Sequence, residues 1–568
     1  ANASGLTVNV GEYVDTTGSD ISAAKATSLT LNVASGKSSA TTPVEVTEFD
    51  GAITAAKATS VVVNAEGKLG SNATITAAAA KSVEITNGAT AGDLDVVAAA
   101  AETLTVTSGN TLDLSAGSNF SGVQSATLNV DQNTLTVGAL ADIANLTATG
   151  AGTATGKLSA VVVGNLGGAN DYDMTVTASG LKGGFTAGTL DVNTGYDITA
   201  DVTGVTGNAT LGNIGAGTAG DAVSINATGL GGNLSVGTIT ATGDITVTGS
   251  ATGTTGLGNI SAGATGNVVV ALDGSTGAVT TGSFTGKTVN IDMSDTIGGK
   301  VGTTYTVVAK DAATVATSEL EGSTVAITAG TGSTALTAAV TGGLGNDGLT
   351  VTGLASNTSI TVTGDLDLGT NSLTVDTTTN DNTAAITINA TGISDYTAGT
   401  FNLGGTAAST VNLGSGTEAD TINWSAAVKA TITGFDTTED TLNFDNVSAG
   451  VGGAVNAVTA GGVTAGNVTP SDIYVIDDGA KALTGTGTET ITDYTDLADV
   501  IAYLDEAYGT ANPSDEAIFV INDLVGDKTY VYHLVDDGVA PAIQAGEITL
   551  IGVITEASGS ALVVGDIA

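Results

Sequence analysis

The residues of this chain best suited to chemistry are carboxylates set among glycines, and that chemistry is the binding of a hard cation. The stretch GGLGNDGLT, residues 342–350, fits the nonapeptide pattern G-G-x-G-x-D-x-U-x. Turns at Gly343 and Gly345 would expose backbone carbonyls, and Asp347 would add a carboxylate. Calcium takes about six to eight such oxygens. The pattern therefore predicts half of a calcium site, with an ordinary Gly-Asn-Asp turn as the alternative.

A second acidic stretch joins two segments, LGSGTEADTINW from Leu413 and ITGFDTTEDTLNFDNV from Ile432. Its pattern resembles the nonapeptide-repeat and C-terminal regions of bacterial RTX (repeats-in-toxin) proteins, in which glycine turns lead into a pair of strands. The matching positions are Gly414, Gly416, Asp420, Ile422, Phe435, Asp436, Asp440, Leu442 and Phe444. The resemblance implies that the three aspartates bind calcium and that the two phenylalanines cap the core. A plain hairpin with solvated acidic turns is the alternative.

The third stretch lies at residues 514–538 and 545–554. It is similar to the terminal domain of bacterial surface-layer (S-layer) proteins and adhesins exported by type I secretion. That resemblance implies an uncleaved C-terminal export signal and an extracellular, cell-surface location. In the same stretch Asp536 and Glu547 stand at positions 1 and 12 of a helix-loop-helix calcium loop, with Ile543 at position 8. Both carboxylates are predicted to bind calcium.

Catalytic residues are scarce. The chain has one histidine, His533, and no cysteine, so neither a Ser-His pair nor a His-rich metal cluster is readily assembled. We expect His533 to be a half-buried strand residue and the protein not to be an enzyme. Paired carboxylates on a β-helix could still act on polysaccharides. That remote alternative lacks the arginine such enzymes use, since all 13 basic residues are lysine.

Charge narrows the range of partners. The chain has 57 acidic residues against 13 lysines, a formal net charge of −44. Nucleic acid is excluded as a partner because its binding requires cationic neutralisation of phosphates. Membrane insertion is not expected, because no apolar run approaches the roughly 18 residues that span a bilayer. The same negative field attracts divalent cations, and calcium is the expected cofactor.

The elements that must position these residues repeat along the chain. Strand cores begin at Leu29, Val61, Val83, Leu104 and Leu128, with spacings of 32, 22, 21 and 24 residues. Repeats of about 22 residues cannot bury a face alone, but stacked coils share a thin aliphatic core. We therefore expect an all-β fold, an elongated β-solenoid with β-helix-like repeats and a small C-terminal α+β domain. Tandem β-sandwich modules are the alternative.

Two further patterns refine this organisation. LGNIGAG, from residue 211, recurs as LGNISAG 46 residues later, close to two periods. Alanine-rich pieces at residues 77–80 and 98–101 could form single helical turns between strands. Nearer the end, residues 495–509 predict an α-helix, with Thr495 as its N-cap.

Composition divides the chain into four regions. Eleven of the 20 aromatic residues lie after residue 400, and a compact core requires such side chains. We predict β-repeat regions at residues 1–210 and 211–400. An RTX-like calcium-binding β-roll would follow at residues 401–460, and an α+β secretion and assembly domain at residues 461–568.

Together these features predict a secreted structural protein that self-assembles, with calcium, into an S-layer lattice or surface filament. Cell-surface polysaccharide is a further expected partner. An adhesin or biofilm-matrix fibre is the alternative function.

Overall fold

In the computed structural model the chain is all-β, with 55% of its residues in strands and one α-helix in the described part. It forms a β-solenoid of about 13 turns, which confirms the predicted fold rather than tandem sandwiches. The structure describes all residues except 1–3, 12–15, 17, 36–46, 89–90, 151–157, 169–170, 194, 217–220, 273, 294–303, 318–323, 331–332, 334–335, 342–347, 353–358, 363–365, 377–385, 390–392, 404–408, 414–418, 426–428, 448–453, 459–467, 470, 480, 482–488, 509–515, 537–541 and 558–559.

Contacts divide the chain into two compact units. Unit 1 comprises Ala1–Lys287 and Ile291–Gly299, and unit 2 comprises Thr288–Asn290 and Lys300–Ala568. The predicted boundary after residue 210 falls inside a strand of unit 1, and the four predicted regions remain a prediction. None of the described helices has the length and apolar character needed to cross a membrane.

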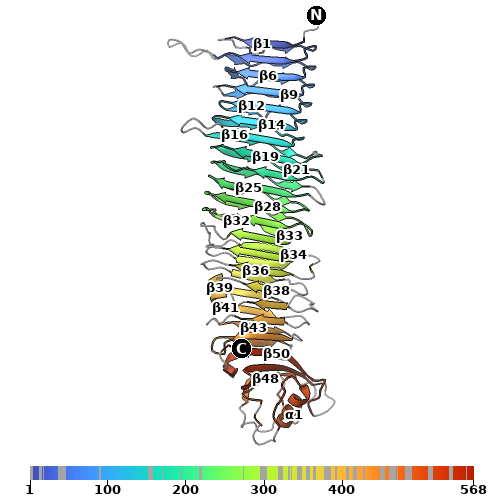
Figure 1. Ribbon diagram of the computed structural model, residues 1–568, viewed down its shortest axis with the longest axis vertical. Helices are drawn as coiled ribbons and strands as arrows, with labels where there is room; N and C mark the ends of the chain where they lie inside the picture. The colour runs from blue at the N-terminus through green and yellow to red at the C-terminus, as the bar shows by residue number, and fades with distance from the viewer. Residues whose placement is uncertain are drawn as a thin grey trace. The chain divides into compact units, whose positions relative to one another are not determined.

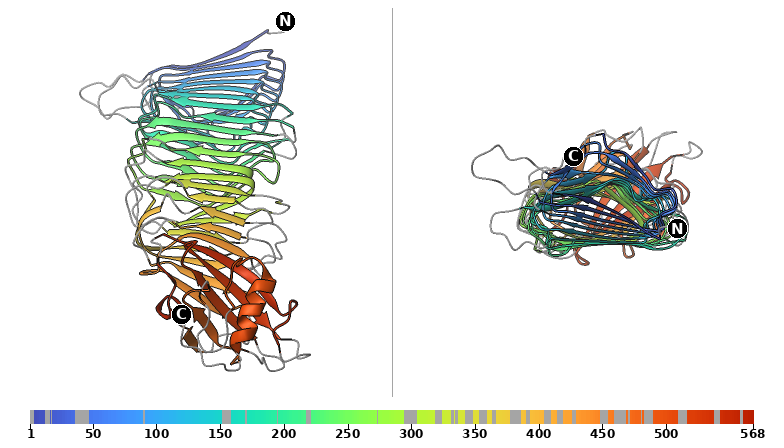
Figure 2. Two further views of the ribbon diagram at one scale, coloured as in Figure 1. Left: turned by 60° about the horizontal axis from the view of Figure 1, so that its bottom comes forward. Right: turned by 90° about the horizontal axis from the view of Figure 1, so that it is seen from above.

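Unit 1 winds as three-sided coils, and its strands pair in parallel with their counterparts one coil away. Figure 1 shows these strands stacked one above the other. Viewed along the stack, the blue and green coils of this unit follow a common outline (Figure 2). The first face consists of β1 (Leu6–Val10), β3 (Leu29–Val33), β6 (Ser60–Ala65), β9 (Ser82–Asn87), β12 (Thr103–Ser108), β14 (Ser125–Val130), β16 (Asn145–Gly150), β19 (Met174–Ser179), β22 (Ile198–Asp201), β25 (Val223–Leu230), β28 (Ile245–Ala251) and β31 (Val268–Ala271).

The other two faces are built from shorter strands. The second consists of β4 (Glu48–Phe49), β7 (Lys68–Leu69), β10 (Gly92–Asp93), β13 (Leu112–Leu114), β15 (Asn133–Val137), β17 (Ser159–Val163), β20 (Gly184–Ala187), β23 (Asn208–Leu211), β26 (Leu234–Val236), β29 (Thr255–Leu257) and β32 (Val279–Thr281). The third consists of β2 (Ile21–Ser22), β5 (Ala52–Thr54), β8 (Thr74–Thr76), β11 (Asp95–Val97), β18 (Leu166–Gly167), β21 (Leu190–Val192), β24 (Ile214–Ala216), β27 (Ile239–Thr240), β30 (Ile260–Ser261) and β33 (Ser283–Met293).

Alternating apolar residues form the core of unit 1, because side chains on a strand point alternately in and out. Leu29 pairs with Val61, which pairs with Val83 and then Leu104, as the predicted spacing requires. Leu104 then pairs with Ala126 rather than with the predicted Leu128. The period-two pattern makes both residues inward-facing, so alternation alone could not choose between them.

The two further repeat patterns have clear structural causes. Leu211 pairs with Val236, which pairs with Leu257, so the LGNI repeat spans two coils as predicted. The alanine-rich pieces are tight turns rather than helical turns. In the first of them the Ala80 N–H donates to the Ala77 carbonyl at 2.9 Å, and both side chains are buried.

A glycine column marks the corner between the second and third faces. A Cβ added at Gly212 would lie 2.6 Å from the Gly188 carbonyl oxygen in the coil before it. In alternate coils an asparagine follows the glycine and bonds to the next coil. The Thr238 N–H donates to Oδ1 of Asn213 at 3.0 Å, and Ser283 does the same to Asn259. The LGNI repeat is therefore a pair of coils joined at one corner.

Unit 2 begins with coils in which β35 to β43 each pair in parallel with the second strand after them, whereas the long strand β34 pairs with both β35 and β36. Its strands are β34 (Thr304–Thr317), β35 (Thr324–Ala329), β36 (Thr337–Thr341), β37 (Gly348–Thr352), β38 (Ser359–Val362), β39 (Leu366–Asp376), β40 (Ile386–Asn389), β41 (Ile393–Leu403), β42 (Ser409–Asn412), β43 (Thr421–Ser425), β44 (Ala430–Phe435) and β45 (Thr441–Asn446).

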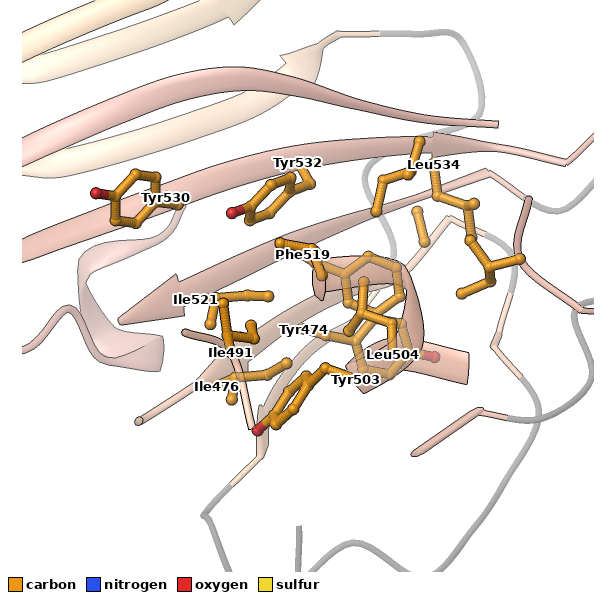
Figure 3. Close-up of a cluster of buried hydrophobic side chains, with 14 of the residues drawn as sticks. Tyr474, Ile476, Ile491, Tyr503, Leu504, Phe519, Ile521, Tyr530, Tyr532 and Leu534 are labelled. Carbon is orange, nitrogen blue, oxygen red and sulfur yellow. The ribbon is translucent and has the colours of Figure 1, made fainter. Parts of the chain in front are cut away.

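The last part of unit 2 is the small α+β domain predicted from the sequence. It contains β46 (Val455–Val458), β47 (Ile473–Ile476), α1 (Leu497–Tyr508), β48 (Glu516–Asp523), β49 (Lys528–Val535), β50 (Ile548–Glu556) and the 3-10 helix η1 (Val564–Asp566). Strands β48, β49 and β50 are antiparallel, and β50 pairs in parallel with β44. Figure 3 shows the aromatic core, in which Tyr474 stacks on Phe519 at a centroid distance of 5.3 Å.

The N-cap of α1 differs from the prediction. The Ala498 N–H donates to Oδ1 of Asp496 at 2.9 Å, so Asp496 rather than Thr495 caps the helix. Thr495 instead donates through its N–H and hydroxyl to Asp493. A carboxylate accepts the free N–H groups of a first turn as well as a hydroxyl does, and the two candidates are adjacent in the chain.

Candidate calcium-binding carboxylates

Asp420 and Asp440 form a ladder across three consecutive coils of unit 2. Each directly precedes a strand, β43 or β45, and both are buried. Oδ1 of Asp420 accepts the Gly399 N–H at 3.0 Å, and Oδ1 of Asp440 accepts the Asp420 N–H at 2.8 Å. Each carboxylate thus accepts a hydrogen bond from a backbone N–H of the coil before it.

Asp436 lies in the turn between β44 and β45. Its Oδ1 accepts the N–H of Thr438 at 2.9 Å and the hydroxyl of Thr438 at 2.7 Å. The Asp436 N–H donates to Oδ2 of Asp440 at 2.7 Å. The three aspartates of the second stretch are therefore linked through backbone hydrogen bonds at one end of the same coils.

Electrostatics makes Asp440 the most perturbed of the three. Burial raises its pKa to about 7, and the carboxylates of Asp420 and Asp436 add to the rise, although two backbone N–H donors oppose it. At neutral pH its carboxyl group is near the midpoint of its titration. A nearby cation would favour the ionised form.

These carboxylates fit calcium only in part. Both oxygens of Asp440 and one of Asp420 already accept backbone N–H groups, which is a structural role. Calcium would have to use their remaining lone pairs together with carbonyls and water.

The resemblance implied that Phe435 and Phe444 cap the core of these coils. Both side chains are buried, and the ring of Phe444 stacks on that of Trp424 at a centroid distance of 5.7 Å.

The third stretch brings two other carboxylates to the paired ends of strands. Asp536 follows β49 and Glu547 precedes β50, and both are buried. The Val535 N–H donates to the Glu547 carbonyl at 2.7 Å, which fixes the two strand ends against each other. Oε2 of Glu547 accepts the Gln544 N–H at 2.7 Å. Ile543, at position 8 of the predicted loop, is buried.

The first predicted site lies outside the described residues, since Gly343, Gly345 and Asp347 fall in residues 342–347. Within the described residues, no three or more His, Cys, Asp or Glu side chains form a group that could hold a metal. Any calcium bound by the described carboxylates would therefore need carbonyl or water ligands as well.

His533 lies in β49, as expected of a half-buried strand residue. Its Nε2 lies 2.7 Å from Oε1 of Glu516 in β48, and both side chains are largely buried. Residues 516 and 533 are diagonal neighbours across an antiparallel strand pair, because Glu516 faces Val535. This contact is a cross-strand polar bridge, and absence of catalysis remains a prediction.

Sequence reasoning missed a stacked pair of carboxylates in unit 1. Asp93 in β10 pairs in register with Asp113 in β13, so two like charges lie one strand spacing apart. Burial raises the pKa of Asp93, and the carboxylates of Asp113 and Asp95 raise it further. The signal in the sequence is their separation of 20 residues, which is close to one coil.

Comparison of the chain with protein-family models, with curated protein sequences and with solved structures finds no match. What these carboxylates do therefore follows from their geometry and charge.

Proposed function

We propose that this chain is an extracellular structural subunit, of the S-layer or surface-filament kind, that assembles with the help of calcium. The observation that carries the proposal is the register of Asp93 and Asp113 on adjacent coils. In a parallel stack, side chains at equivalent positions of adjacent coils lie about one strand spacing apart, so these two acidic side chains place negative charge close together on one face. Such a surface needs counterions before another copy can approach.

The magnitude of the charge supports this. With 57 acidic and 13 basic residues, the formal charge is −44 per chain, and self-repulsion of that size opposes association. Calcium neutralises two charges per ion and prefers carboxylate and carbonyl oxygens. Divalent ions shared between chains would turn repulsive faces into adhesive ones.

The best candidates for resident calcium are Asp536 and Glu547. Both carboxylates are buried, and burying an ionised carboxylate is costly unless a cation or several donors compensate. The paired ends of β49 and β50 hold their backbones together. Calcium there would order the domain that, by resemblance, directs type I secretion and assembly.

The test is reversible assembly. In calcium, the purified chain should form periodic sheets or regular filaments, visible by negative-stain electron microscopy. Excess EDTA should dissolve them, and renewed calcium should restore them. Sodium chloride at matched ionic strength is the control, because screening alone should not restore order. Assemblies that persist unchanged in excess EDTA at low salt would contradict the proposal.

A further inference from the structure

Strand β1 is the end strand of the first face within the described part of the chain. Among the described strands, β1 pairs only with β3, whereas β3 pairs with β1 and β6. A strand paired on one side presents a row of unused N–H and C=O groups and readily accepts another strand.

Two apolar side chains of β1 are also less buried than their partners in the next coil. Leu6 and Val8 are partly exposed, whereas their partners in β3, Leu29 and Leu31, are fully buried. Removing that apolar surface from water would favour any strand that continued the stack.

Hydrogen bonds fix which groups face outward. The Leu6 N–H donates to the Ser28 carbonyl at 2.9 Å, and the Ala34 N–H donates to the Val10 carbonyl at 3.0 Å. Residues 6, 8 and 10 therefore direct their backbone groups toward β3. Because successive residues alternate, the backbone groups of Thr7 and Asn9 point to the open side.

Unit 2, by contrast, closes its last coil within the chain. Strand β50 pairs along β44, and Leu442 of β45 bridges to Ile567 beside η1. The Ala568 N–H also donates to the Leu442 carbonyl at 2.9 Å. The chain thus supplies a cover for that coil, while the described part supplies none for β1.

We propose that β1 is the site at which two copies of this chain join, with β1 antiparallel to the partner's β1 about a two-fold axis at Val8. This inference rests on the proposed self-assembly and names one of its contacts. The two-fold places Thr7 opposite the partner's Asn9. Such a pair exchanges both backbone hydrogen bonds, and these are the residues whose groups point outward. Leu6 lies opposite the partner's Val10, so the apolar side chains of both copies share one face.

A second copy fits this edge better than a charged partner does. The sequence LTVNV has no charge and no proline, the devices that usually protect an edge strand. In a chain with a formal charge of −44, residues 6–10 themselves bring no carboxylate to such a contact. Its alternation reads the same in both directions, so a symmetric interface matches apolar with apolar and polar with polar.

Thr7→Pro tests the proposal. Proline removes the outward N–H and leaves the bonds from Leu6 and Val10 to the next coil in place, so the fold should persist. In EDTA, light scattering coupled to gel filtration should give twice the 54.6 kDa chain mass for the unmodified protein and for the control Thr7→Val. Thr7→Pro should raise the dimer dissociation constant at least tenfold. Hydrogen exchange with single-residue resolution should show the Thr7 and Asn9 amides protected only in the dimer.

Each result decides the matter. A dimer unaffected by Thr7→Pro, or a chain that stays monomeric in EDTA, would overturn the proposal. So would protected Thr7 and Asn9 amides in a species of monomer mass, because another part of the same chain would then cover the edge. The proposed function is tested separately. A β1 dimer that never assembles further in calcium would refute the proposed function and leave the β1 contact standing. Calcium-dependent assembly from monomers would refute the β1 contact and leave the proposed function standing.

Discussion

The backbone N–H of Asp420 donates to Oδ1 of Asp440 across 2.8 Å, so a buried carboxylate in one coil holds the coil before it. Because burial raises the Asp440 pKa from 3.8 to about 7, the folded chain binds a proton that the unfolded chain releases within that window. The stability contributed by this proton is fully present below pH 3.8 and is lost as the pH rises to about 7. After allowance for solvent screening, the loss is about 2 kcal/mol. In the variant Asp440→Asn, the thermal midpoint of unfolding should therefore depend less on pH across that range.

Asp493→Asn provides a control of opposite sign. The hydroxyl and N–H of Thr495 lower the pKa of Asp493, so its contribution is lost as the pH falls through the acid range. This variant should be less stable than the parent above the ordinary aspartate pKa of 3.8, and the difference should disappear as the pH falls below that value. A profile between pH 4 and 7 that Asp440→Asn leaves unchanged would show that Asp440 does not titrate there.

Asp536 and Glu547 should hold one calcium ion between them. Replacing both with their amides, Asp536→Asn and Glu547→Gln, removes two negative ligands at nearly constant shape. Isothermal titration should then show one fewer calcium ion per chain, and calcium should raise the thermal midpoint less than in the parent. The surface variant Glu102→Gln is the matched control, because Glu102 is half exposed and paired with Lys81. Equal stoichiometry in all three proteins would remove these residues from the calcium site.

Gly212 should not tolerate a methyl group. A Cβ there would lie 2.6 Å from the Gly188 carbonyl oxygen and 2.7 Å from its carbonyl carbon, which are backbone atoms that cannot rotate away. We expect Gly212→Ala to lower the free energy of unfolding by about 1–3 kcal/mol. Gly215→Ala, three residues later, meets only Asp191 Oδ1 at an ordinary 3.6 Å and should be neutral or stabilise by about 0.5 kcal/mol. Equal effects in urea denaturation would refute the close approach at this corner.

Asn213 should contribute a single hydrogen bond to coil stacking. Asn213→Ala leaves the Thr238 N–H without its acceptor and should cost about 1 kcal/mol. Asn213→Asp keeps an acceptor oxygen and should cost less. Thr238→Ala is the control because it retains the N–H that donates. Hydrogen exchange at Thr238 should quicken in the alanine variant at position 213 and in neither of the others.

Much of the architecture follows from the spacing of apolar residues. The starts at Leu29, Val61, Val83 and Leu104 lie in one inward-facing column, because in-register parallel stacking requires equivalent residues at every coil. The number of sides per coil was not predictable. Strands such as β2 and β27 contain only two residues, too few for alternation to be visible. The change from three strands per coil in unit 1 to two in unit 2 therefore leaves no periodic signal.

The candidate sites were predictable as residues but not as contacts. The tetrapeptides beginning at Asp420 and Asp440, DTIN and DTLN, are nearly identical and 20 residues apart, so their stacking could have been inferred. The hydrogen-bond partners of these aspartates could not have been inferred. Gly399 and Asp420 donate through their backbone N–H groups, which every residue except proline has. Asp93 and Asp113 match no known motif, and their separation of 20 residues is the one sequence signal that they stack.

In-register stacking also determines how unit 1 responds to damage and to change. Each coil touches only the coil before it and the coil after it, so stability is a sum of nearest-neighbour couplings rather than one cooperative whole. A defect at one corner should melt a few turns and leave distant ones folded. By the same reasoning, the addition or deletion of a complete turn during evolution changes the contacts between coils at only one place in the stack. Length is then a freely adjustable property of such a protein.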